Sequence, residues 1–121
     1  MTMGKTERKK ELLAAYKERP QVGGVCLVRN TATGRVWLMS CRDTAAQQNR
    51  FAFSSATNTP LLPAMGPDFA AYGADSFTFE VPEALEKKPE QTDKEFLADL
   101  EALEFLWRDR LTGEGAEFYG N

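Results

Sequence analysis

The apolar positions in the first third of the chain fall into two short runs with a turn-forming cluster between them. The runs cover residues 24–28 and 36–39, and the cluster covers residues 30–34. Gly34 can adopt the positive φ angles that a tight loop needs. Two such runs joined by a short glycine-containing loop predict a β-hairpin. Because both runs are apolar at nearly every position, we expect helices to cover both faces of the hairpin.

Helix signals lie on either side of the hairpin. Residues 5–19 carry apolar side chains at helical spacing, and Pro20 marks the end of that helix. Asp43 is a suitable N-cap for a second helix over residues 44–54. Residues 67–72 begin with proline and precede a glycine, which predicts a third, short helix.

One more strand and one long helix follow. Residues 76–81 alternate apolar and polar side chains, so they predict a strand with one buried face, and Pro82 is expected to end it. Thr92 and Glu95 form the pattern of a capping box ahead of a helix over residues 93–111. Its apolar residues recur every three or four positions, which predicts packing on the sheet: Phe96, Leu100, Leu103, Trp107 and Leu111. We expect the aromatic tail to be pinned or frayed.

These elements predict an α+β fold. The expected architecture is a small three-stranded antiparallel sheet, made of the hairpin and one later strand, flanked by helices. The length of 121 residues is that of one domain. We therefore expect a single domain over residues 1–121, with an N-terminal helix in residues 1–20 and the core in residues 21–121.

Composition and cysteine content restrict the compartment. The chain is 42% hydrophobic and 27% charged, as is ordinary for a globular protein. No stretch is long enough for a membrane span, and the N-terminus lacks the apolar core of a signal peptide. Cys26 and Cys41 form neither a disulfide framework nor a zinc motif, so we expect reduced thiols, with Cys26 buried, in a cytoplasmic protein.

Charge and the absence of histidine restrict the chemistry. The chain has no histidine, which excludes an imidazole base and a histidine-ligated metal. Its net charge of −3 argues against a surface built to neutralise phosphates. The predicted N-terminal helix is locally basic, either as a phosphate-contacting arm or, as we favour, as a solvated face. Its basic residues include Lys5, Arg8, Lys9, Lys10 and Lys17.

One carboxylate stands out on the long predicted helix. At about 100° per residue, Glu104 falls inside the apolar arc around Leu100 and Trp107. A carboxylate in that place needs a metal, water or a charged partner. Glu104 is therefore either a site residue or the partner of Arg108, four positions on. Glu101 points away from the arc and is expected at the surface.

The hairpin and several later phrases resemble the GIY-YIG nuclease family, and in particular its small stand-alone bacterial members. The family carries Gly-Ile/Val-Tyr on the first strand and Tyr-Ile-Gly on the second, where this chain has residues 24–26 and 37–39. The similar phrases are residues 45–51, FTFEV (77–81), EQTDKEF (90–96), LEALEFLW (100–107) and the terminal YGN. The resemblance covers nearly the whole chain and implies the same fold.

The resemblance also implies a site, with losses. Gly24 matches the first motif glycine, Ser40 matches a serine that follows the second motif, and both are then substrate-binding. Cys26 and Trp37 stand where the two tyrosines should be, and Met39 replaces the second glycine. Arg50 fits the family's arginine, a few residues farther along than usual, as a catalytic and substrate-binding residue. Glu104 matches the glutamate that binds Mg²⁺ or Mn²⁺.

The family is understood to use a tyrosine hydroxyl on the attacking water and the arginine on the phosphorane-like charge. A cysteine is a whole ring shorter than tyrosine, and tryptophan offers one donor and no acceptor. We therefore favour a non-catalytic descendant that binds nucleic acid or protein, without a cofactor. The alternative is a weak or altered metal-dependent DNA endonuclease that uses Glu104 and Arg50. These two could also be relics, with Arg50 paired to Glu104, and a dimer surface at Trp37 or Phe53 is a third hypothesis.

Overall fold

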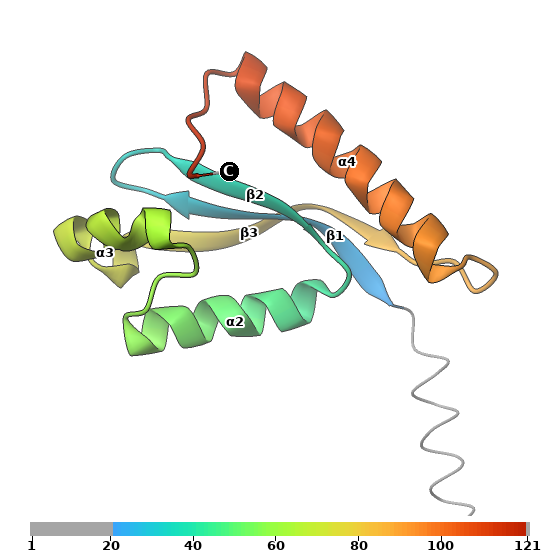
Figure 1. The fold of residues 1–121 in the computed structure, drawn as a ribbon, viewed down its shortest axis with the longest axis horizontal. Helices are drawn as coiled ribbons and strands as arrows, with labels where there is room; N and C mark the ends of the chain where they lie inside the picture. Colours follow the sequence, from blue (N-terminus) through green and yellow to red (C-terminus); the bar gives the residue numbers. More distant parts are fainter. Residues whose placement is uncertain (1–20, 121) are drawn as a thin grey trace, which may run out of the picture.

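The computed structural model describes residues 21–120 (Figure 1), so the predicted helix over residues 5–19 lies outside the described part. The helices and strands follow one another as β1 (Val22–Asn30), β2 (Val36–Cys41), α2 (Thr44–Thr57), α3 (Gly66–Tyr72), β3 (Phe77–Glu86) and α4 (Asp93–Gly113). Short 3₁₀ turns precede α3 and β3. Within the described residues this is the predicted order of elements.

The three strands form one antiparallel sheet in the order β2-β1-β3, so the predicted hairpin and α+β class are confirmed. Leu27 on β1 pairs with Leu38 on β2, and its neighbour Val28 pairs with Phe79 on β3. Figure 1 shows α4 lying across one face of the sheet, with α2 and α3 on the other. Both faces of the hairpin are therefore covered, as its continuous apolar runs predicted.

The α4 face of the sheet has an aliphatic core. Val25 and Leu27 on β1 and Leu38 on β2 are buried there together with Leu111 of α4. Val25 and Leu27 are two positions apart on β1, and Leu38 is opposite Leu27, so the three side chains share one face. Leu103 and Trp107 of α4 pack against the same cluster. The predicted apolar arc of the long helix is thus its contact with the sheet.

The opposite face, toward α2 and α3, has an aromatic core. Val28, Phe69, Phe77 and Tyr119 are buried in it. The half-buried side chains that pack around this cluster include Trp37, Met39, Phe51 and Phe79. Because Trp37 and Met39 alternate with Val36 and Leu38 along β2, they point to the α2 side of the sheet.

The predicted end of β3 at Pro82 is wrong, since the strand continues to Glu86. The register explains why proline is tolerated. Leu27 pairs with Glu80 and Val25 with Glu83, so Val81 and Pro82 together oppose the single residue Cys26. Proline lacks an N–H, and a bulge on an edge strand is a place where no ladder bond is needed.

The caps and the tail follow the sequence signals. The Asp43 carboxylate accepts from the N–H of Ala46 at the start of α2, and Thr92 and Glu95 form the predicted capping box. The C-terminal segment is pinned to the free edge of β2. The N–H of Tyr119 donates to the carbonyl of Val36 at 2.7 Å, and the N–H of Val36 donates to Glu117 at 2.9 Å. Among residues 21–120, no helix has the length and apolarity to cross a bilayer.

Candidate functional site

Gly24 stands at the position of the first motif glycine, and the packing of the sheet itself requires a glycine there. Gly24 has a φ of 152°, and a side chain on it would collide with the backbone of Glu83 and Ala84 on β3. This close approach of two strands is available only to glycine. The fold therefore explains structurally why residue 24 is a glycine. The predicted contact of Gly24 with substrate stays a prediction.

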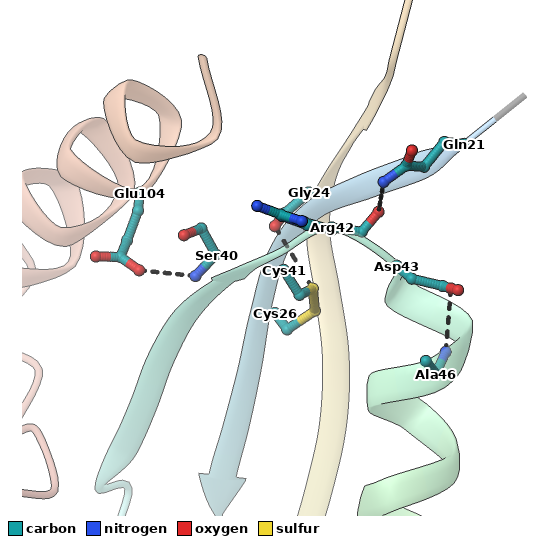
Figure 2. The surroundings of a disulfide bond; sticks show 9 residues. All are labelled: Gln21, Gly24, Cys26, Ser40, Cys41, Arg42, Asp43, Ala46 and Glu104. Carbon is teal, nitrogen blue, oxygen red and sulfur yellow. Dashed lines mark hydrogen bonds between the residues drawn. A yellow bond between two sulfur atoms is a disulfide. The ribbon is translucent and has the colours of Figure 1, made fainter. Parts of the chain in front are cut away.

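The two cysteines are joined. Cys26 and Cys41 form a disulfide across β1 and β2, with 6.8 Å between their Cα atoms, so the expectation of reduced thiols is wrong (Figure 2). The register accounts for the pairing. Cys26 is opposite Met39 and Cys41 is opposite Gly24, which places the cysteines diagonally on one face. The predicted cytoplasmic location, which rested in part on free thiols, stays a prediction.

The positions of the two motif tyrosines both face α2. Cys26 is fully buried, as predicted, and its sulfur is bonded to Cys41. Trp37 is half-buried against the aromatic core, and its predicted role in a dimer surface stays a prediction. Met39 packs beside it. A disulfide sulfur has no proton to transfer, and the indole has no acceptor. These three side chains contribute packing on this face.

Glu104 lies on the other side of the sheet, at the outer edge of β2. One carboxylate oxygen accepts the backbone N–H of Ser40 at 2.7 Å, and the other is 3.7 Å from the Arg108 guanidinium. Arg108 also donates to the carbonyl of Leu38 at 3.4 Å. The predicted pair of Glu104 with Arg108 is therefore present. Together the two side chains satisfy backbone groups of an edge strand that no other strand covers.

Arg50 is an exposed residue of α2 and lies beside a cavity of about 450 Å³. The cavity is lined by this helix and the loop that follows it, including Phe53, Pro60 and Leu61. Phe53 is 71% exposed. The half-buried positions of the helix that turn toward the sheet are Thr44, Gln47, Phe51 and Ser55, together with the buried Ser54. Arg50 is exposed and lies one helical turn before the buried Ser54, beside the same cavity.

Glu104 and Arg50 do not share a cleft. Glu104 belongs to α4, which packs on Leu27 and Leu38, whereas Arg50 belongs to α2, which packs on the opposite face through Phe51. Figure 2 shows the same division, with Glu104 on one side of the strands and the disulfide on the side of α2. The interpretation of these two residues as a pair is therefore wrong, because the sheet lies between them.

The described residues offer little for a divalent ion. Among residues 21–120, no cluster of three or more His, Cys, Asp or Glu side chains is placed to hold a metal. Mg²⁺ can be held by one or two carboxylates with water and phosphate. In Glu104, however, one oxygen accepts an N–H and the other faces a guanidinium. A resident Mg²⁺ or Mn²⁺ does not fit this arrangement.

A buried polar group near the hairpin turn was missed from the sequence. Asn30 is fully buried, and its amide donates to the Tyr119 hydroxyl at 3.0 Å and to Asp68 at 3.3 Å. The Tyr119 hydroxyl donates to Asp68, and the Arg35 guanidinium lies 4.3 Å from the Tyr119 ring centroid. Desolvation, and then the hydrogen bond to Asp68, raise the pKa of Tyr119. The sequence signal for this polar group was Asn30, a polar residue at the end of an apolar strand.

A similar fold occurs in the solved structure of a nuclease domain. The chain is similar to the catalytic domain of the homing endonuclease I-TevI, at 16% identity and a TM-score of 0.52, over 82% of this chain and 99% of that domain. A mutant of the same catalytic domain matches equally, with 92% of it covered. I-TevI is a GIY-YIG nuclease, so the predicted resemblance is confirmed at the level of the fold. No protein-family model and no curated protein matches the sequence.

Proposed function

We propose that this chain is a GIY-YIG-fold binding protein without nuclease activity. The observation that carries the proposal is the position of the candidate residues. Arg50 is separated from Glu104 by the sheet, and the residue at the first tyrosine position is buried in a disulfide. A phosphodiesterase needs the base, the cation and the metal ligand within reach of one phosphate. No group on either face completes such a set within the described residues.

Charge favours a protein partner over nucleic acid. The sequence from residue 21 onward has nine Lys and Arg side chains against fifteen Asp and Glu side chains, an excess of six negative charges. Binding to the phosphate backbone depends on cations that displace counterions. The acidic core instead complements a basic protein surface. Nucleic-acid binding is the alternative partner class, and it would fall on the basic residues before position 20.

The second candidate is a weak endonuclease that depends on Mg²⁺ or Mn²⁺. It is favoured by one observation, namely that Glu104 keeps its place on α4 and is 30% exposed. In that case Glu104 would have to leave Ser40 and Arg108 to take a metal. Arg50 would act only if α2 moved to the other side of the strands, so the geometry favours the binding protein.

A nicking assay separates the two candidates. Supercoiled plasmid is incubated with the parent chain in Mn²⁺, beside Glu104→Ala and the matched variant Glu101→Ala, which alters an exposed carboxylate of the same helix. We expect no nicked product above background from any of the three. Nicking by the parent and by Glu101→Ala, but not by Glu104→Ala, would establish the endonuclease instead.

A binding measurement then decides the partner class. Fluorescent duplex and single-stranded DNA are titrated with the parent chain at about 50 and 200 mM salt, a range over which phosphate contacts lose much of their affinity. We expect weak or no binding at both salt concentrations. Tight binding that falls steeply with salt would overturn the assignment of a protein partner.

A further inference from the structure

The cavity beside Arg50, which we call the α2 pocket, has apolar walls. Its volume is about 450 Å³, and its apolar side chains are Phe53 of α2 and Pro60 and Leu61 of the loop that follows. Phe53 is 71% exposed, so its ring is largely open to water. Pockets that bind small organic molecules have volumes of about 300 to 1,000 Å³ and walls that are mostly apolar. The α2 pocket therefore has the size and the lining of a site for a small organic ligand.

Hydrogen bonds fix the loop that forms one wall of the pocket. Asn58 follows α2 in the left-handed conformation, with a φ of 56°, and its N–H donates to the carbonyl of Ser55 at 3.3 Å. The N–H of Thr59 donates to the carbonyl of Ser54 at 3.0 Å, and the Ser54 hydroxyl donates to the carbonyl of Thr59. The wall is thus in place without a ligand, which lowers the free-energy cost of binding.

The pocket carries a single charge. Residues 44–67 contain no Asp, Glu or Lys, and Arg50 is the one charged residue among them. Other arginines in the described structure have a carboxylate at 3.7 Å or less, namely Arg29, Arg35, Arg108 and Arg110. Within residues 21–120 no carboxylate pairs with Arg50, although acidic side chains outnumber basic ones there. Its guanidinium can therefore bind an anion from outside that part of the chain.

The lone cation and the apolar walls together define the class of ligand. A guanidinium binds a carboxylate through two parallel N–H···O bonds, and the side-chain amide of Asn49, which also lines the pocket, can donate another. The Phe53 ring favours an aromatic group, because ring pairs gain contact energy beyond the area that they bury. A ligand with several negative charges, such as a nucleotide, would leave charges unpaired here and would be repelled by the acidic remainder of the chain.

We infer that the α2 pocket binds a small aromatic monocarboxylate. The ligand carboxylate accepts from the Arg50 guanidinium, and the ligand ring packs against Phe53 and Leu61. This inference goes beyond the proposed function and does not rest on it, because the pocket can hold such a ligand whether or not the chain also binds a protein.

A titration of the isotope-labelled full chain, followed by the nuclear magnetic resonance of its amides, tests the assignment with phenylacetate as the probe. We expect phenylacetate to shift the amide signals of residues 49–61 with a Kd of about 1 mM, as a ligand of this size allows. Phenylacetamide has the same shape without the charge, and it should bind at least about tenfold more weakly because the charge-assisted hydrogen bonds are lost. Absence of these shifts at about 10 mM phenylacetate, or equal binding of the two probes, would overturn the inference.

Two variants with matched controls locate the binding. Arg50→Gln removes the cation, and its control Arg42→Gln alters another exposed arginine just ahead of the same helix. Phe53→Ser removes the exposed ring, and its control Phe105→Ser alters an equally exposed phenylalanine of α4. We expect each pocket variant to raise the Kd for phenylacetate at least about fivefold, and each control to change it less than about twofold. Unchanged binding by either pocket variant, or an equal loss in its control, would contradict the assignment.

Discussion

The two faces of the sheet use their polar residues in different ways. On the α4 face, polar side chains of the helix reach the strands: Glu104 accepts from Ser40, Arg108 donates to the carbonyl of Leu38, and Trp107 donates to Glu83 at 2.8 Å. The core beneath them is aliphatic. On the α2 face, the core is aromatic, and Asn30, Asp68 and Tyr119 form a polar group at one end of it.

This difference shows why resemblance to a motif does not reveal a residue's role. Glu104 matches the family's metal ligand, yet in this fold it satisfies the N–H of an edge strand. Cys26 matches a tyrosine, yet it joins β1 to β2 from the opposite face. Each side chain meets a local requirement of the sheet, and the two requirements lie on different sides of it. The same comparison suggests where substitutions should cost most.

The largest effect is expected from a buried residue on the α4 face. Leu27→Ala removes a side chain that is 1% exposed at the centre of the aliphatic core. It should lower the free energy of unfolding by about 3 kcal/mol, since the transfer term and the residual cavity add. Met39→Ala, half-buried on the α2 face, should lose less than half as much. Urea denaturation measures both, and an equal loss would show that the two cores are packed alike.

A smaller effect is expected at the edge of β2. Glu104→Ala removes the acceptor for the Ser40 N–H and should cost about 1 kcal/mol. Glu104→Gln keeps an acceptor oxygen and should recover most of that loss, because a half-exposed ion pair at 3.7 Å contributes little. Thermal melts of both variants, with and without Mn²⁺, make the comparison. If Glu104→Gln lost as much stability as Glu104→Ala, the charge of Glu104, and not its hydrogen bond, would be what stabilises the edge strand.

The smallest effect is a dependence on alkaline pH from the α2 face. The pKa of Tyr119 is raised from its ordinary value of 10.0, first by desolvation and then by the bond to Asp68. The folded chain therefore holds the phenol proton more tightly than the unfolded chain. This contribution to stability is complete below pH 10 and declines as pH rises through the folded pKa.

Difference absorbance between the parent and Tyr119→Phe isolates the titration of this phenol. We expect phenolate to form at a pH above 10, together with a decline in the melting temperature of the parent that the Phe variant does not share. A Tyr119 that titrates at or below 10 would show that the polar group is open to water.

Much of the fold could be predicted because its signals are local. The turn at residues 30–34, the N-cap Asp43 and the capping box of Thr92 and Glu95 each act within a few residues of the chain, and the structure contains all three. The end of β3 could not be predicted in this way. Pro82 stops a strand unless that strand bulges at the proline, and the bulge in β3 depends on its pairing with β1.

The candidate site was predicted only in part for the same reason. The helical periodicity placed Glu104 on the packed side of α4 and identified Arg108 as a partner, which the structure contains. Only the family resemblance related Arg50 to Glu104, and no local pattern tests that relation, since the two residues lie on different helices. The polar group of Asn30, Asp68 and Tyr119 joins three distant segments, and no local pattern connects them.

The sequence by itself determined which segments are helices and strands and which side of each is apolar, because backbone propensity and periodicity act over a few residues. Tertiary structure alone decided which helix covers which face of the sheet, and so it separated Arg50 from Glu104. It also decided that the two cysteines form a disulfide. The register of β1 and β2 brings Cys26 and Cys41 together, and register arises only when two strands pair.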